Sequence, residues 1–180
     1  VIGMVGPVTN RTCNEAQIDA PYRTYGEMLT FANDRFKSQR GVHNPIRMLA
    51  MFCVAIRKDV FKEIGPLDEQ FEIGMFEDDD YAMRVQKAGY RVVCAEDVFV
   101  HHFGQASFGE LCNNGEYDKV YNANKERFES KWGIQWQPHG RRTTPEYVEL
   151  RNHLRDLIHK TVPANSVVIV VSKGDEELLK

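Results

Sequence analysis

Four consecutive acidic residues, Glu77, Asp78, Asp79 and Asp80, are the feature of the sequence best suited to chemistry. Adjacent carboxylates repel one another, so such a run costs stability unless a cation or a helix dipole compensates it. Helix capping, with Arg84 pairing one turn away, would explain Asp79 or Asp80. Because capping does not require four acids, we expect at least one of them to have a functional role.

Two other uses of clustered acids fit this spacing less well. A calcium loop of the EF type needs alternating oxygen ligands, a glycine turn and a distant glutamate, whereas consecutive acids point to opposite sides. Glycoside hydrolysis uses two carboxylates that face each other across a sugar. The sequence offers no evident partner for that arrangement, although it stays open.

A second feature is the histidine pair His101 and His102, which follows the apolar residues Val98, Phe99 and Val100. Successive side chains of a strand face opposite sides, so only one of the two can enter a shared site. A lone histidine at a strand end is more often structural than a metal ligand. The histidine pair follows the acidic run by one helix and two strands, a separation that would let the pair and the acidic run reach the same edge of the sheet.

The elements around these residues follow the order expected of an α/β fold. Apolar runs and turn signals predict strands over residues 1–7, 48–57, 90–95 and 98–102. Helical periodicity and end signals predict helices over residues 25–37, 58–64, 81–88, 117–132 and 145–160. A polar loop at residues 9–12 follows the first strand, and the β-branched run 167–171 is typical of a strand buried on both faces.

Composition excludes several classes of protein. The chain has 180 residues, 42% of them apolar, which is enough for one buried core. A formal net charge of −3 gives no support to nucleic-acid binding, and the apolar runs are too short to cross a bilayer. The cysteines have no C-x-x-C spacing, which favours a reducing cytosol; they are Cys13, Cys53, Cys94 and Cys112. Because Val1 opens in mid-strand, we expect a fragment of a longer protein.

An ordered series of motifs within residues 51–102 resembles family 2 glycosyltransferases of the GT-A fold. The motifs are FCVAIRK (52–58), IGPLDEQF (64–71), FEDDDYAMR (76–84), AGY (88–90) and the two histidines, preceded by VGPVTN (5–10). The resemblance implies an α/β fold with a GT-A-like mixed sheet and flanking helices. Residues 1–140 would be the C-terminal, acceptor-binding part, without the N-terminal nucleotide-binding half. Residues 141–180 would supply a helix, a linker and the first strand of a following α/β domain.

The resemblance also implies an activity of the hexosyltransferase type, in which a sugar passes from a nucleotide-sugar donor to a hydroxyl of a glycan or other acceptor, with inversion. Asp78 would be the general base, and His102, or alternatively His101, would bind a divalent Mn²⁺ or Mg²⁺. The expected acceptor-binding residues are Glu77, Asp79, Met51 and Phe52, and the expected donor-binding residues are Thr9 and Asn10. Since the family's D-x-D metal ligands are missing, the fragment alone is expected to be inactive.

Two other functions remain open, namely a degenerate carbohydrate-binding domain and a structural domain of a polysaccharide-assembly protein. The intact pair Glu77 and Asp78, together with His102, favours the transferase. Met51 stands where the family often has glycine, which predicts a narrower acceptor pocket. By analogy we expect a cytoplasmic location at the inner face of a membrane, with which the parent protein would associate peripherally and without a transmembrane segment.

Overall fold

The computed structural model describes residues 1–103, 115–142, 145–163 and 166–169. The chain divides into two compact units, Val1–Arg142 and Thr143–Lys180. Every residue expected to act at a site lies in the first unit, so the site is described within that unit. Whether residues 141–180 begin a following domain stays a prediction.

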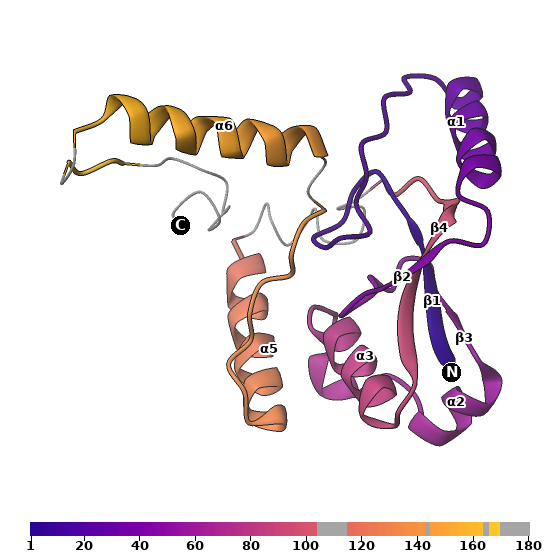
Figure 1. Cartoon of the computed structure of the whole chain (residues 1–180). Helices are drawn as coiled ribbons and strands as arrows, with labels where there is room; N and C mark the ends of the chain where they lie inside the picture. Colours follow the sequence, from indigo (N-terminus) through magenta and orange to yellow (C-terminus); the bar gives the residue numbers. More distant parts are fainter. Residues whose placement is uncertain (104–114, 143–144, 164–165, 170–180) are drawn as a thin grey trace. The chain divides into compact units, whose positions relative to one another are not determined.

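The first unit is built on a mixed sheet with the strand order β2-β4-β1-β3 (Figure 1). The two long strands, β1 (Ile2–Val8) and β4 (Arg91–Phe99), run parallel at its centre. The short strands β2 (His43–Pro45) and β3 (Ala55–Ile56) pair antiparallel with β4 and β1 respectively. This confirms the predicted α/β fold with a mixed sheet and flanking helices, and it is consistent with a partial GT-A-like sheet.

The helices lie close to their predicted positions because their ends carry local signals. Thr24 and Glu27 form a reciprocal capping box at the start of α1 (Tyr25–Ser38), and Gly65, at φ 85°, ends α2 (Lys58–Ile64). The remaining helical elements are the 3₁₀ turn η1 (Glu69–Phe71), α3 (Glu77–Lys87), α5 (Tyr117–Trp132) and α6 (Pro145–Thr161). No helix among the described residues has the length and apolar character needed to cross a membrane.

The main core lies between the central strands and α3. Its buried side chains include Met4 of β1, Val85 of α3 and Val92 of β4. A Cβ atom on Gly6 would lie only 2.8 Å from Cδ2 of Leu49, so a glycine at this point lets the segment before β3 pack directly on β1. A second cluster of Phe71, Phe76 and Phe128 lies where α5 packs near η1 and the start of α3.

The predicted strand over residues 48–57 is wrong for most of its length. Met48 and Leu49 are buried in the main core without strand pairing, and residues 51–53 form a turn. Only Ala55 and Ile56 pair with β1. A short apolar run can be buried as a strand or as an irregular segment, and periodicity alone does not separate the two.

The two strands predicted over residues 90–95 and 98–102 are one strand, β4, which ends at Phe99. Glu96 does not make a turn, because its carboxylate is buried and paired with Arg35 at 2.5 Å and Arg142 at 2.6 Å. Asn44 donates a further hydrogen bond to it at 2.9 Å. Although burial alone would raise the pKa of Glu96, these partners hold it below its ordinary value.

Two further boundaries differ from the expectation. Helix α3 begins at Glu77 rather than at Tyr81, so the acidic run forms its first turn, where carboxylates are favoured by the helix dipole. Residues 166–169 form no strand, with Val167 92% and Ile169 85% exposed, whereas a strand buried on both faces was expected there. The rest of that run, residues 170–171, lies outside the described residues, as does Cys112.

Candidate functional site

The last acid of the run, Asp80, has a structural environment. Its side chain is fully buried and accepts hydrogen bonds from Nε of Arg84 at 2.9 Å and Nε1 of Trp132 at 3.0 Å. Nζ of Lys131 lies 2.6 Å from the same carboxylate. A buried charge needs such partners, and these ones join α3 to the end of α5.

Asp79 is also held by side chains that follow α5. Its carboxylate is buried and accepts from Nε1 of Trp136 at 3.3 Å and from Nε2 of His139 at 3.1 Å. The imidazole of His139 is itself almost fully buried, and its Nδ1 atom has no hydrogen-bond partner within the described part of the chain. The segment after α5 therefore covers this acid, which was expected to bind the acceptor.

Asp78 and Glu77 differ from their neighbours, because among the described residues no cationic side chain pairs with either. Both side chains are half-buried, and Oε2 of Glu77 is a buried oxygen without a partner there. Burial, followed by the charges of Glu77 and Asp79, raises the pKa of Asp78 to about 8. Burial and the charge of Asp79 also raise the pKa of Glu77.

The backbone that leads into these acids has an unusual conformation. Met75 and Phe76 both have φ of 73°, in the left-handed region that non-glycine residues rarely adopt. The amide of Asn124, buried in α5, donates to the carbonyl oxygens of Phe71 at 2.8 Å and Gly74 at 2.7 Å. Strained backbone of this kind persists only where surrounding contacts hold it, and it is frequent at functional sites.

His102 lies just beyond β4 and is held by the loop that follows β1. Its backbone N–H donates to Oδ1 of Asn10 at 2.7 Å, and its ring Nδ1 lies 2.8 Å from the carbonyl oxygen of Arg11. Because that carbonyl can only accept, Nδ1 carries the proton and Nε2 keeps a lone pair suited to a metal. Phe52 stacks on the ring, with centroids 4.2 Å apart.

His101 makes different contacts. Its Nδ1 atom forms a hydrogen bond with the hydroxyl of Tyr22, and its ring packs edge-on against Phe103. Tyr22 in turn packs against Phe31 and Phe99. His101 therefore belongs to an aromatic cluster between α1 and β4, and it does not share the contacts of His102.

The loop of residues 9–18 connects the acidic run with His102. Desolvation of the thiol, followed by the charges of Asp78 and Asp79, raises the pKa of Cys13, so the loop tip lies within electrostatic reach of both acids. The loop is held in shape by Asn14, which is buried, donates to the carbonyl oxygen of Met48 at 2.9 Å and accepts from the N–H of Ala16 at 3.0 Å. The same loop thus contacts His102 and lies within electrostatic reach of Asp78 and Asp79.

The other predicted site residues are placed as follows. Asn10 and Phe52 both contact His102. Thr9 is fully buried, and its hydroxyl donates to Oδ1 of Asn10 at 3.3 Å, so Thr9 helps to orient the side chain of Asn10. Met51 packs against the main core.

The sequence analysis missed the residues that hold Asp79 and Asp80, namely Trp132, Trp136 and His139. The available signal was the close spacing of both tryptophans of the chain with a histidine, because a buried indole N–H needs an acceptor. Within the described ranges, no three histidine, cysteine or acidic side chains are grouped closely enough to hold a metal ion. Among the described residues, His102 would therefore be at most one ligand of a metal ion.

Comparison with known proteins gives one weak relationship. The chain is 29% identical over 105 residues to "O-antigen biosynthesis protein RfbC" of Myxococcus xanthus. The matched region covers 58% of this chain and 8% of that protein, so the chain spans only a small part of its relative. No protein-family model and no solved structure matches the chain significantly.

Proposed function

We propose that this chain supplies the acceptor side of an inverting, metal-dependent glycosyltransferase of family 2, and that Asp78 is its general base. The observation that carries the proposal is the difference among the four acids. Asp79 and Asp80 are engaged by partners from and after α5, whereas Asp78 has no cationic partner among the described residues. The similarity to a protein of O-antigen biosynthesis supports a role in making polysaccharide.

The environment of Asp78 suits proton transfer. A carboxylate whose pKa is raised to about 8 binds a proton more strongly than an ordinary aspartate, so it is a better acceptor for the proton of an attacking hydroxyl. Inversion follows when the base activates the acceptor oxygen for a single in-line displacement of the nucleoside diphosphate. Only the ionised form can act, so kcat/KM should rise with pH up to about 8.

Glu77 is proposed to bind the acceptor, since its unpartnered buried oxygen can accept a hydrogen bond from a sugar hydroxyl. Phe52, which stacks on the His102 ring, would offer an apolar face to the acceptor. His102, through Nε2, would be one ligand of Mn²⁺ or Mg²⁺, an ion that neutralises the departing diphosphate. The remaining metal ligands and most of the donor site would come from sequence outside this chain.

The proposal is tested by measuring Mn²⁺-dependent release of nucleoside diphosphate from a panel of nucleotide sugars. The protein used is the longer one that contains this chain, compared with its Asp78→Asn variant. We expect turnover to fall by about 100-fold or more, because a positioned general base typically contributes 10²–10⁴, while binding of the nucleoside diphosphate is retained.

Asp34→Asn is the matched control, since Asp34 is exposed on α1 and has no side-chain partner within the described ranges. It should leave turnover unchanged. Turnover unaffected by Asp78→Asn, or no turnover with any donor, would contradict the proposal and favour a carbohydrate-binding domain without catalysis.

A further inference from the structure

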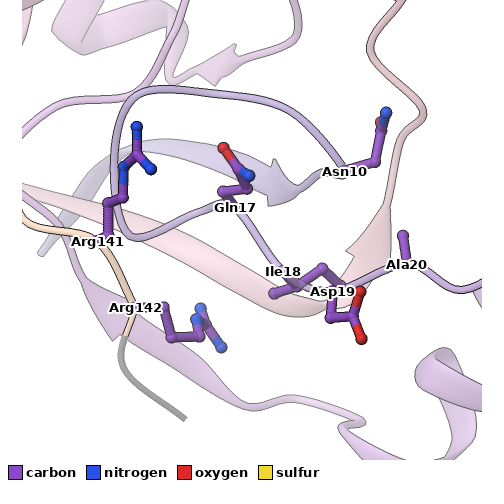
Figure 2. A pocket seen from close by; sticks show the side chains of 7 residues that line it. All are labelled: Asn10, Gln17, Ile18, Asp19, Ala20, Arg141 and Arg142. Atoms are coloured by element: carbon purple, nitrogen blue, oxygen red, sulfur yellow. The ribbon is translucent and has the colours of Figure 1, made fainter. Parts of the chain in front are cut away.

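A polar pocket with a volume of about 460 Å³ opens beside the loop that holds His102. It is lined by two short segments of the first unit, the loop after β1 and the end of the segment after α5 (Figure 2). The volume lies within the range of about 300–1,000 Å³ that is usual for small-molecule sites. The lining residues are Asn10, Gln17, Ile18, Asp19, Ala20, Arg141 and Arg142.

The walls of this pocket are held rigidly. Arg142 pairs with Glu96 at 2.6 Å and donates from Nε to the carbonyl oxygen of Glu15 at 3.0 Å. The side chain of Asn10 makes two hydrogen bonds with the backbone of His102. Its Oδ1 atom accepts from the N–H of His102 at 2.7 Å, and its Nδ2 atom donates to the carbonyl oxygen of His102 at 3.2 Å. A site held in this way loses little conformational entropy when it binds a ligand.

Other polar groups of the lining remain available for a ligand. Neither Arg141 nor Asp19 has a side-chain partner within the part of the chain that the structure describes. Gln17 accepts from the N–H of Thr12 through Oε1 at 3.1 Å, which leaves its amide N–H groups as donors. The pocket thus offers a guanidinium, a carboxylate and an amide, a mixture of donors and acceptors.

The polar groups of the pocket suit a ligand with several hydroxyl groups. The guanidinium of Arg142 pairs with the buried carboxylate of Glu96, which Arg35 also pairs. Arg141 and Asp19 are the charged lining groups that have no such pair within the described residues. Hydroxyl groups of a ligand can donate to Asp19 and accept from Arg141 and Gln17, whereas a phosphate or carboxylate ligand offers Asp19 no donor.

We propose that this pocket binds one pyranose unit of a saccharide, with Gln17, Asp19 and Arg141 recognising its hydroxyl groups. The assignment rests on the proposed function and extends it, because Asn10 joins the pocket to His102. A bound pyranose would lie against the same loop whose tip approaches Asp78. The unit can belong to the acceptor glycan or to the sugar of the donor, which share this chemistry.

The test is an NMR titration of the full, ¹⁵N-labelled chain that follows the side-chain amide of Gln17. The probes are the methyl α-glycosides of glucose, galactose and mannose, together with UDP-glucose, UDP and inorganic phosphate. We expect a saturable shift with at least one glycoside or with UDP-glucose. Asp19→Asn and Arg141→Ala should each weaken binding about tenfold or more, the loss of one hydrogen bond to a charged group.

The control variants are Asp34→Asn and Arg40→Ala, exposed residues of the same types outside the pocket, which should leave binding unchanged. A shift with a glycoside would identify an acceptor unit, and a shift with UDP-glucose but not with UDP would identify the donor sugar. Equal shifts with UDP or phosphate, or no shift with any probe, would overturn the proposal. Because this readout needs no turnover, it is independent of whether Asp78 acts as the base.

Discussion

Nε2 of His139 lies 3.0 Å from Oδ1 of Asp79, although 60 residues of sequence separate the two. The contact brings the segment after α5 onto the first turn of α3. It occupies Asp79, while Asp78 and Glu77 on the same turn stay without a cationic partner among the described residues. The geometry therefore divides the acidic run into two residues that are held by side chains from and after α5 and two that have no cationic partner among the described residues.

The contact between His139 and Asp79 predicts a stability effect. His139→Ala leaves a buried carboxylate with Trp136 as its remaining side-chain donor, so we expect the free energy of unfolding to fall by about 2 kcal/mol. His139→Gln should cost less, because an amide N–H can still donate. Urea unfolding followed by the fluorescence of Trp132 and Trp136 measures both. His153→Ala, exposed on α6, should change the midpoint very little; an equal loss there would contradict the assignment.

Asp80 should matter far more to stability than an exposed acid in an ion pair of similar length. Asp80→Asn removes a fully buried charge that faces Arg84 and Lys131, and we expect a loss of about 2–4 kcal/mol. Asp59→Asn is the control, because its pair with Arg57 is exposed to solvent and should contribute little to stability. Equal losses in thermal unfolding of the two variants would show that α5 is not held through Asp80.

The raised pKa of Asp78 predicts that the stability of the folded chain depends on pH. Its pKa is raised from 3.8 to about 8 in the folded chain, so between these values the folded state binds more protons than the unfolded state. Stability therefore falls as pH rises through this window. Asp78→Asn removes the free-energy cost of ionising this carboxyl in the folded state. The variant should therefore be more stable by about 1–3 kcal/mol at pH 8.5, and this difference should shrink towards pH 4. A gain that does not depend on pH would contradict the raised pKa.

The approach of the loop 9–18 to the acidic run predicts how Cys13 reacts. Asp78→Asn removes a charge that raises the pKa of the Cys13 thiol, so alkylation by iodoacetamide at pH 8 should become about twofold faster. The measurement needs a Cys112→Ser background and peptide mapping to separate Cys13 from Cys53 and Cys94. Asp34→Asn should leave the rate unchanged. An unaltered rate in Asp78→Asn would place the loop tip out of reach of this acid.

Local sequence determined most of the helices and the class of the fold. The ends of α1 and α2 are set by Thr24 with Glu27 and by Gly65, residues within a few positions of the helices that they cap. The order of elements and the β-type runs were sufficient to predict an α/β sheet with flanking helices. Capping and turn formation act over short distances along the chain, so they can be predicted from the sequence without knowledge of the packing.

Tertiary structure alone decided what the polar residues do. Glu96 lies inside one continuous strand because Arg35 and Arg142, far away in sequence, neutralise it. In the same way, the partners that follow Lys131, namely Trp132 for Asp80 and Trp136 and His139 for Asp79, lie more than 50 positions further along the chain, and Arg84 is a local partner of Asp80. The sequence therefore predicted a functional role for at least one acid of the run, but only the packing of α5 and the segment after it distinguished Asp78 from its neighbours. The physical reason is that a buried charge is tolerated only where long-range contacts bring a partner to it.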